Sequence, residues 1–205
     1  MATRAAKSSW KIVPLTLARW SDFTLLFGPK GACAGCWCTW PRFKSAEFRA
    51  ATPAKRRSHI RRVVGAGEAP GLIAYDGTTP VGWIAVAPRA DYPRFETSRV
   101  LAPVDEEPVW SVPCFFVART HRGRGLTVAL LEAACAHAAK RGATIVEGYP
   151  VDTRGKKQAA AFVWTGLPGA FEKAGFREVE RRSPVRPIMR RTVRAVRAKK
   201  AAARG

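Results

Sequence analysis

Residues 117–127 read Val117-Ala118-Arg119-Thr120-His121-Arg122-Gly123-Arg124-Gly125-Leu126-Thr127, and this run decides the fold. The stretch that leads into it and overlaps its first two residues, residues 108–118, is strongly apolar and typical of a buried strand. Pro113 lies inside that strand and cannot donate a ladder hydrogen bond, which predicts a bulge or an unpaired side there. After the run, a helical period over residues 125–141 gives an apolar face made of Leu126, Leu130, Ala133, Ala134 and Ala138. The run is therefore the turn of a strand–turn–helix unit.

This turn has the composition of an anion site. Backbone N–H groups at a helix start have no internal acceptor, and the helix dipole adds about half a positive charge there. Gly123 and Gly125 allow the backbone to approach a diphosphate without a Cβ in the way, while Arg122 and Arg124 add full positive charges. The turn is too short for a Walker loop and lacks the third glycine of a dinucleotide fingerprint. By itself such a turn is weak evidence, because it could also be a basic surface turn, but its place between a buried strand and a helix favours the anion site.

The elements around this unit indicate a layered fold. Strands are expected at residues 10–15, 71–75, 80–86, 144–151, 177–181 and 185–189. Helices are expected at residues 17–27, from Thr52-Pro53 to Gly65, and just before Phe176, whereas residues 88–107 read as irregular. The order of these segments predicts a mixed sheet covered by helices, an α/β or α+β fold. In this fold the helix over residues 125–141 connects two parallel strands.

The composition suits one domain with ragged ends. The 205 residues are 47% hydrophobic and 25% charged, which excludes a wholly disordered chain. We expect the domain over residues 10–190, a flexible N-terminal tail over residues 1–9 and a basic C-terminal tail over residues 191–205. The net charge is +21, yet ten Lys or Arg and no acidic residue lie between Arg181 and Gly205. This distribution favours a solvated tail over a specific nucleic-acid-binding arm.

The cysteines do not form a recognisable metal site. Three of the five, Cys33, Cys36 and Cys38, lie close together, but no second pair of Cys or His follows at zinc-ligand spacing. We expect free thiols, no metal and a reducing compartment. No apolar run reaches the roughly 20 residues that cross a bilayer, and the polar start lacks a secretory signal, so the expected location is the cytoplasm. A monomer or a homodimer is expected.

The strand–turn–helix run also resembles a family motif. Residues 117–127 are similar to the acetyl-coenzyme A motif of GNAT N-acetyltransferases, Gln/Arg-x-x-Gly-x-Gly/Ala, with Arg122 and Gly125 matching and Thr127 replacing the last small residue. Residues 171–176, Phe-Glu-Lys-Ala-Gly-Phe, are similar to the family's Tyr-x-x-x-Gly-Phe ending. The likeness in element order spans residues 10–189.

The resemblance implies a mostly antiparallel, splayed sheet flanked by helices on both faces. It also implies acetyl-coenzyme A as co-substrate, with the pantetheine arm on the backbone of the apolar strand and the pyrophosphate on the turn. The thioester would then point between the strand that ends at Ala118 and the strand that begins at Thr144. The implied cofactor-binding residues are Phe115, Phe116, Val117, Arg122, Gly123, Arg124, Gly125, Leu126, Thr127 and Phe171.

The same resemblance implies direct attack of an amine on the thioester, which needs an acid and a base. Phe171 replaces the usual tyrosine acid and has no proton to give, and Ser111 stands near the family's glutamate base and could only position a water. Glu147 and Tyr149 alternate onto one face of the next strand and are candidates for base and acid. The alternative is a paired structural carboxylate beside a packed tyrosine. For Cys114 an inert buried thiol is favoured over an acylated nucleophile.

The acceptor and the final function class are less defined. Candidate substrate-binding residues are Trp37, Trp83, Asp91, Tyr92 and Ser111. The favoured function is an N-acetyltransferase acting on a small-molecule or protein amine, with no membrane partner. The alternatives are an acetyl-coenzyme A-binding protein whose chemistry has decayed, and a nucleic-acid or ribosome-associated factor that uses the basic tail.

Overall fold

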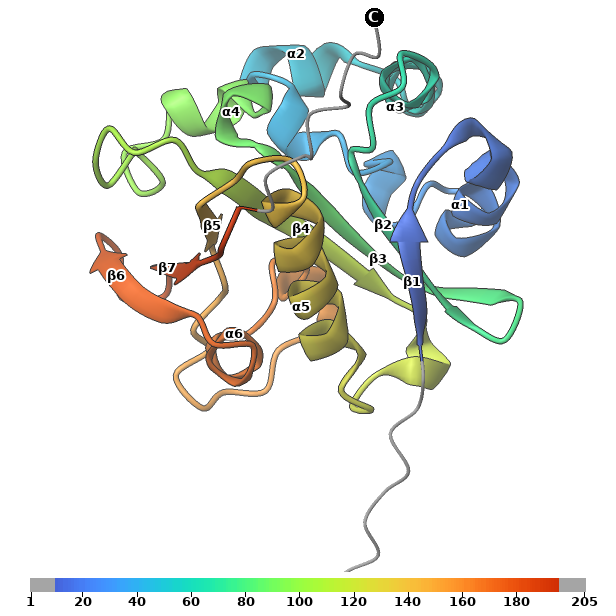
Figure 1. Cartoon of the computed structure of the whole chain (residues 1–205). Helices are drawn as coiled ribbons and strands as arrows, with labels where there is room; N and C mark the ends of the chain where they lie inside the picture. Colours follow the sequence, from blue (N-terminus) through green and yellow to red (C-terminus); the bar gives the residue numbers. More distant parts are fainter. Residues whose placement is uncertain (1–9, 196–205) are drawn as a thin grey trace, which may run out of the picture.

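The computed structural model describes residues 10–195, so the expected N-terminal tail and most of the C-terminal tail lie outside the described residues. Short 3₁₀ turns join the main elements (Figure 1). In chain order these are β1 (Lys11–Pro14), α1 (Trp20–Phe27), α2 (Ser45–Ala50), α3 (Pro53–Gly65), β2 (Gly71–Asp76), β3 (Thr79–Pro88), α4 (Pro93–Glu96), β4 (Trp110–Val117), α5 (Leu126–Ala139), β5 (Ile145–Gly148), α6 (Pro168–Lys173), β6 (Arg177–Arg181) and β7 (Pro187–Thr192).

The strands form one seven-stranded sheet in the order β1-β2-β3-β4-β5-β7-β6. Every neighbouring pair is antiparallel except β4 and β5, which are parallel and are connected through α5. Figure 1 shows β1 at one edge, β6 at the other, and α5 in front of the central strands. The expected mixed sheet with a helical crossover is confirmed.

Helices cover both faces of this sheet, as expected. On one face, α1 and α3 bury Phe23, Phe27 and Ile60 against Trp83 of β3 and its neighbours. On the other face, α5 and α6 bury a hydrophobic cluster that includes Leu130 and Phe171. Thr52 begins α3 by accepting a hydrogen bond from the amide of Lys55 at 3.2 Å, with proline in the first turn.

The sheet opens between its two central parallel strands. β4 pairs with β5 only at Trp110↔Val146, Ser111↔Glu147 and Val112↔Gly148. Pro113 follows directly and has no N–H to continue the ladder, and the register of β4 with β3 shifts at the same place. The residues of β4 beyond Val112 therefore have no partner in β5, which confirms the splayed sheet.

Four segments differ from the expectations. Residues 45–50 and 93–96 form short helices inside stretches that carried no clear period. β5 ends at Gly148 rather than reaching residue 151, because Pro150 lacks a donor and the chain turns away. β7 runs over Pro187–Thr192, so two residues assigned to the basic tail, Arg191 and Thr192, lie in the sheet.

Gly148 occupies a position where a side chain does not fit. A Cβ there would lie 2.1 Å from Cε1 of Phe171, whose ring is fully buried. We predict that Gly148→Ala lowers the free energy of unfolding by about 2 kcal/mol, the cost of overpacking a rigid core site. Urea unfolding measures it. Gly65→Ala, where a Cβ has open space, is the matched control and should be nearly neutral; equal effects of the two changes would contradict this packing.

His137 of α5 is buried with its Nε2 unpaired, while its Nδ1 accepts a hydrogen bond from Arg141 at 3.1 Å. Burial, reinforced by Arg141 and Lys140, lowers the pKa of His137 from 6.5 to about 4. Between pH 6.5 and 4 the unfolded chain therefore binds a proton at His137 that the folded protein does not bind. The free energy of unfolding falls as the pH falls from about 6.5 towards 4.

Between pH 7.5 and 5, protonation of His137 in the unfolded chain should lower the free energy of unfolding of the wild type by about 2 kcal/mol. His137→Leu removes the titrating ring, so the variant should lose that much less stability than the wild type over the same interval. Urea unfolding at several pH values measures the difference. If the free energy of unfolding changed with pH equally in the two proteins, the His137 ring would be protonated equally in the folded and the unfolded state, which would contradict the prediction.

Candidate functional site

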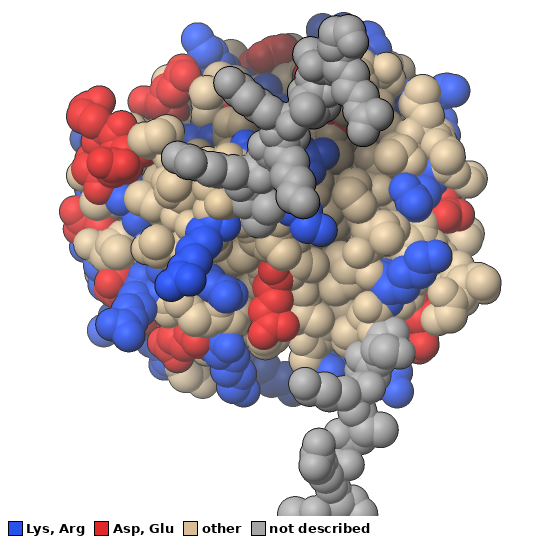
Figure 2. Space-filling view, viewed as in Figure 1, with Lys and Arg blue, Asp and Glu red and all other residues tan. Residues whose placement is uncertain are grey.

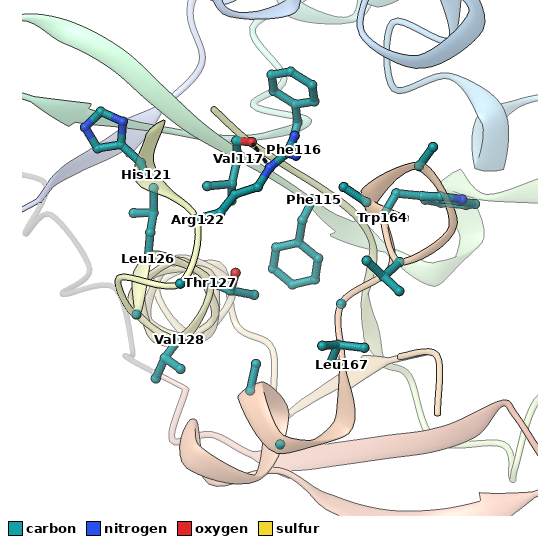
Figure 3. A pocket seen from close by; sticks show the side chains of 18 of the residues that line it. Phe115, Phe116, Val117, His121, Arg122, Leu126, Thr127, Val128, Trp164 and Leu167 are labelled. Atoms are coloured by element: carbon teal, nitrogen blue, oxygen red, sulfur yellow. Dashed lines mark hydrogen bonds between the residues drawn. The ribbon is translucent and has the colours of Figure 1, made fainter. Parts of the chain in front are cut away.

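A cavity of about 810 Å³ lies at the open end of the sheet. Three parts of the chain enclose it: the end of β4, the turn and first residues of α5, and the segment from Ala160 to Lys173. Ala32 and Cys33, from the loop after α1, complete its wall. Figure 3 shows the ring of Phe115 between the start of α5 and the segment that carries Trp164 and Leu167.

The first backbone N–H groups of α5 are available to bind a ligand. Gly123 and Gly125 have φ angles of 73° and 83°, a left-handed conformation that side chains disfavour. No side chain caps the helix, and its first internal hydrogen bond in this region runs from the amide of Val128 to the carbonyl of Gly125 at 3.0 Å. The Arg122 guanidinium donates to the carbonyl of Val117 at 3.0 Å, which holds its charge at the cavity. The turn therefore offers uncapped N–H groups and a cation on one wall.

The opposite wall is not β5 but the segment that precedes α6. The amide of Phe115 donates to the carbonyl of Trp164 at 2.7 Å, and the amide of Val151 donates to the carbonyl of Gly166 at 2.9 Å. Residues 164–166 thus bridge the two diverging strands near the point where they separate. Beyond that bridge, Phe116 and Val117 line the cavity, paired with β3 on one side and with no strand on the side of β5.

Most of the predicted cofactor residues lie together at this cavity. The structure places the following of them in its wall: Phe115, Phe116, Val117, Arg122, Gly123, Gly125, Leu126 and Thr127. Arg124, in the same turn, is not part of the wall. Phe171 is fully buried behind the wall, edge-on to Phe115 with ring centroids 5.9 Å apart. It supports the wall from the core and does not contact the cavity.

The candidate acid and base lie elsewhere, in a buried polar network. The two oxygens of Glu147 accept hydrogen bonds from Arg89 at 3.1 Å and from Arg190 at 2.7 Å. Tyr149 donates to Glu147 at 2.6 Å and accepts from Arg89 at 2.7 Å. Ser111 lies 2.8 Å from the same hydroxyl, and because the Tyr149 proton is used by Glu147, Ser111 is the donor.

This network is suited to structure rather than to proton transfer. Glu147 is fully buried between two cations, and neither it nor Tyr149 lines the cavity. Burial and the charge of Glu147 raise the pKa of Tyr149 well above its usual value, so its proton is held tightly. Arg190 also pairs with Asp105 at 2.6 Å, and Arg89 also donates to the carbonyl of Leu101. Of the two alternatives, the contacts favour the paired structural carboxylate.

The predicted substrate-binding residues are not brought together at the cavity. Four of them are buried: Trp37, Trp83, Tyr92 and Ser111. Trp37 and Trp83 pack with Phe23 and Phe27 as part of the core under α1. Asp91 keeps about a third of its side chain exposed and lies 3.7 Å from Arg42. These contacts give the tryptophans the packing role that seven tryptophans in one chain suggest.

Sequence reasoning missed the residues of two wall segments. Val163, Trp164, Leu167 and the turn Ala160–Phe162 lie in a stretch for which the sequence analysis expected no more than a helix just before Phe176. The apolar run that follows the polar residues 152–158 was the available signal for this wall. Nothing in the sequence indicated that Ala32 and Cys33 reach the cavity.

Two general features of the described residues complete this description. Within residues 10–195, no three His, Cys, Asp or Glu side chains are grouped as metal ligands. Over the same residues, no helix combines the length and the apolar character needed to span a bilayer.

Comparison with known proteins gives a family and a fold. A sequence model of the acetyltransferase (GNAT) family matches residues 30–162, which is more than half of the chain. No curated protein sequence matches. Among solved structures, the GNAT domain of PAT from S. lividans is similar with a TM-score of 0.55 and 16% identity, over 90% of each chain.

Two further structures were determined with a cofactor. The putative acetyltransferase yncA from Salmonella typhimurium, with its cofactor acetyl-CoA, gives a TM-score of 0.53 at 13% identity, over 94% of this chain and 98% of that one. The NatC complex bound to Gag peptide and CoA gives 0.52 at 13% identity, over 90% and 98%. At such identities the likeness concerns the fold alone.

The Glu147 network makes a testable difference to stability. Glu147→Gln leaves Arg89 and Arg190 largely buried without their shared charge, so we predict a loss of about 3 kcal/mol in the free energy of unfolding at pH 7. Asp152→Asn, which breaks an exposed pair with Arg181, is the control and should have little effect. A Glu147→Gln protein as stable as the wild type but unable to turn over acetyl-CoA would restore the catalytic assignment.

Proposed function

The chain belongs to the acetyltransferase (GNAT) family, and we propose that it transfers an acetyl group from acetyl-CoA to an amine. The observation that carries this proposal is the uncapped start of α5, which opens into the cavity at the end of the splayed sheet. Backbone amides and the helix dipole favour phosphate oxygens there, and Arg122 adds a full charge. We assign the pyrophosphate of the cofactor to residues 122–127.

The rest of the cavity suits the pantetheine arm. Its walls are largely apolar, and beyond Phe115 the edge of β4 that faces away from β3 has no partner strand, so the polar groups on that edge are available to an extended amide chain. The cavity is lined from the turn before α5 to Ala32 and Cys33, and we propose that the thioester end of the cofactor lies near the loop after α1. We assign Phe115, Phe116 and Val117 to this arm.

For this acetyl transfer, the main task of the protein is to hold the amine next to the thioester. The amine nitrogen forms a bond to the thioester carbonyl carbon, the carbon–sulfur bond breaks, and the proton lost by the amine ends on the departing sulfur, directly or through water. Among residues 10–195, those that line the cavity include neither a carboxylate nor a tyrosine; the ionisable ones are Cys33, His121, Arg122 and Lys173. A water-mediated proton path fits this wall better than Glu147 and Tyr149 do.

The same observation supports a second candidate, a protein of this family that binds acetyl-CoA without turning it over. Phe171 lies where relatives of the family carry a tyrosine acid, and it is buried away from the cavity. Both candidates predict CoA binding. Only the enzyme predicts that free CoA appears when acetyl-CoA is mixed with an amine acceptor.

The surface gives less support to the third candidate, a nucleic-acid-associated factor. Figure 2 shows Lys and Arg side chains interspersed with Asp and Glu on the face it draws, rather than one continuous basic surface. The last ten residues of the basic tail lie outside the described residues. The proposed acceptor of the acetyl group is a small-molecule amine or a protein amine.

The test uses two arginines of one turn as a matched pair. Arg122 lines the cavity and Arg124 does not, although the two carry the same charge and are only two positions apart in the chain. We predict that Arg122→Ala weakens CoA binding about 10-fold, the loss of one charge-assisted contact, and that Arg124→Ala weakens it much less. Calorimetric titration with CoA gives the two dissociation constants.

The wild type should also be stabilised by about 2.7 kcal/mol when CoA is present at about 100 times its dissociation constant. Release of free CoA from acetyl-CoA across a panel of amines then separates the enzyme from the non-catalytic binder. Equal weakening by the two arginine changes, or no binding of CoA by the wild type, would contradict the proposed site.

A further inference from the structure

Helix α3 carries a basic surface that is separate from the cavity. Its sequence holds five Lys or Arg and no acidic residue. Arg56 points inward and donates to the carbonyl of Phe48 at 2.7 Å. The other four are exposed, and we call them the α3 cations: Lys55, Arg57, Arg61 and Arg62. None of these four lines the cavity.

The α3 cations have no carboxylate partner in the protein. All 15 Asp and Glu of the chain lie in residues 10–195, and none of them forms an ion pair with an α3 cation. Residues 1–9 and 196–205 hold only six of the 36 Lys and Arg and no acid, so residues 10–195 have a net charge of +15. The excess of positive charge therefore belongs largely to the folded part of the chain.

The positions of three of these cations are unfavourable for the helix itself. Lys55 lies in the first turn, which contains no acidic residue, and a cation there opposes the helix dipole. Arg57 and Arg61 are four positions apart on one side of the helix, and a like-charged pair at this spacing destabilises a helix. Arg62 differs, because it lies in the last turn, where a cation is favourable. Helix stability therefore does not account for Lys55, Arg57 and Arg61.

Two tryptophans orient part of this surface from the core side. Helix α3 lies beside α1 (Figure 1), and the two helices share a buried cluster that includes Trp20 and Trp37. The Cζ atom of Arg57 lies 5.9 Å from the ring centroid of Trp20 and 5.4 Å from that of Trp37. The Cζ atom of Arg61 lies 6.0 Å from the ring centroid of Trp20. Such contacts restrict the two exposed arginines and lower the entropy that they lose when a partner binds.

The chemistry of this surface suits a phosphate backbone better than a protein or a bilayer. The exposed residues of α3 include no large apolar side chain, whereas the core of a protein interface is apolar and depleted of charge. A helix that lies in a membrane surface also needs apolar side chains on the face that enters the lipid. Nucleic acid needs neither, because Lys and Arg contact its phosphates directly. From Lys55 to Arg62 the helix rises about 10 Å, a length over which a DNA duplex carries about six charges.

We propose that the α3 cations bind the phosphate backbone of a nucleic acid, independently of its sequence. Phosphate groups between Arg57 and Arg61 relieve the repulsion that the isolated helix bears, and arginine suits them because its guanidinium can donate two hydrogen bonds to one phosphate. The proposed contact uses α3 rather than the basic tail and leaves the cavity to the cofactor. It does not rest on the proposed acetyl transfer, because no α3 cation lines the cavity.

The test measures binding of the full chain to a fluorescently labelled DNA duplex and to a single-stranded RNA of the same length, by anisotropy at several salt concentrations. Each phosphate contact contributes about 0.9 to the slope of log K against log salt on a duplex and about 0.7 on a single strand. We expect the triple variant with Lys55→Gln, Arg61→Gln and Arg62→Gln to lose about 2 to 3 of this slope on the preferred probe. At equal salt it should also bind at least about 10-fold more weakly.

The matched control removes the same charge from exposed positions outside α3, with Lys140→Gln, Lys156→Gln and Lys157→Gln. It should lose less than about 1 of the slope. Single variants guard against an effect of Arg61 on the packing of Trp20. Lys55→Gln and Arg62→Gln leave both arginine–tryptophan contacts in place, and each should lower the slope on a duplex by about 0.9.

Three results would overturn the proposal: no binding of either nucleic acid by the wild type, an unchanged slope in the α3 variants, or an equal loss in the two triple variants. Competition tests the other classes of partner. Polyglutamate or phosphatidylserine vesicles should displace the labelled nucleic acid less effectively, per charge, than the same nucleic acid without a label. Equal displacement by either competitor would show that α3 does not favour a phosphodiester chain, and would also overturn the proposal.

Discussion

The structure depends on the separation of β4 from β5 after Val112. A parallel pair is held by regularly spaced hydrogen bonds, and here two prolines remove donors at the point of separation: Pro113 on β4 and Pro150 just beyond β5. The strands diverge, and the chain fills the start of the gap with its own residues 164–166. The remainder of the gap, closed on one side by the turn before α5, is the cavity.

Where β4 and β5 still pair, a buried polar network stabilises the sheet next to this opening. There Glu147 joins Arg89, from beyond β3, to Arg190 of β7, and Tyr149 and Ser111 complete the hydrogen bonding. A buried carboxylate is stable only when it is paired and fully hydrogen-bonded, and this one is. The network holds β4, β5 and β7 together next to the point where pairing stops. Polar residues on a central strand thus stabilise the fold in a place where sequence reasoning also allowed catalysis.

Much of the fold, and part of the site, was predictable from the sequence. The strand–turn–helix unit around Arg122 and the disruption at Pro113 follow from local chemistry, because helix period, glycine and proline act over a few residues. The roles of Glu147 and Trp83 were not predictable, because a period of two assigns a face to a strand residue but not the partner that covers it. The wall around Trp164 depends on a contact with Phe115, 49 positions earlier in the chain, which no local pattern encodes.

The central claim is that CoA lies in the gap between β4 and the segment before α6, with its phosphates at the start of α5. Amide hydrogen exchange with and without CoA tests this most directly, because it reports individual parts of the backbone. The account predicts that CoA slows exchange in residues 115–128 and 160–167 and leaves β1 and β6 unchanged. Protection confined to other segments, or unchanged exchange at saturating CoA, would contradict it.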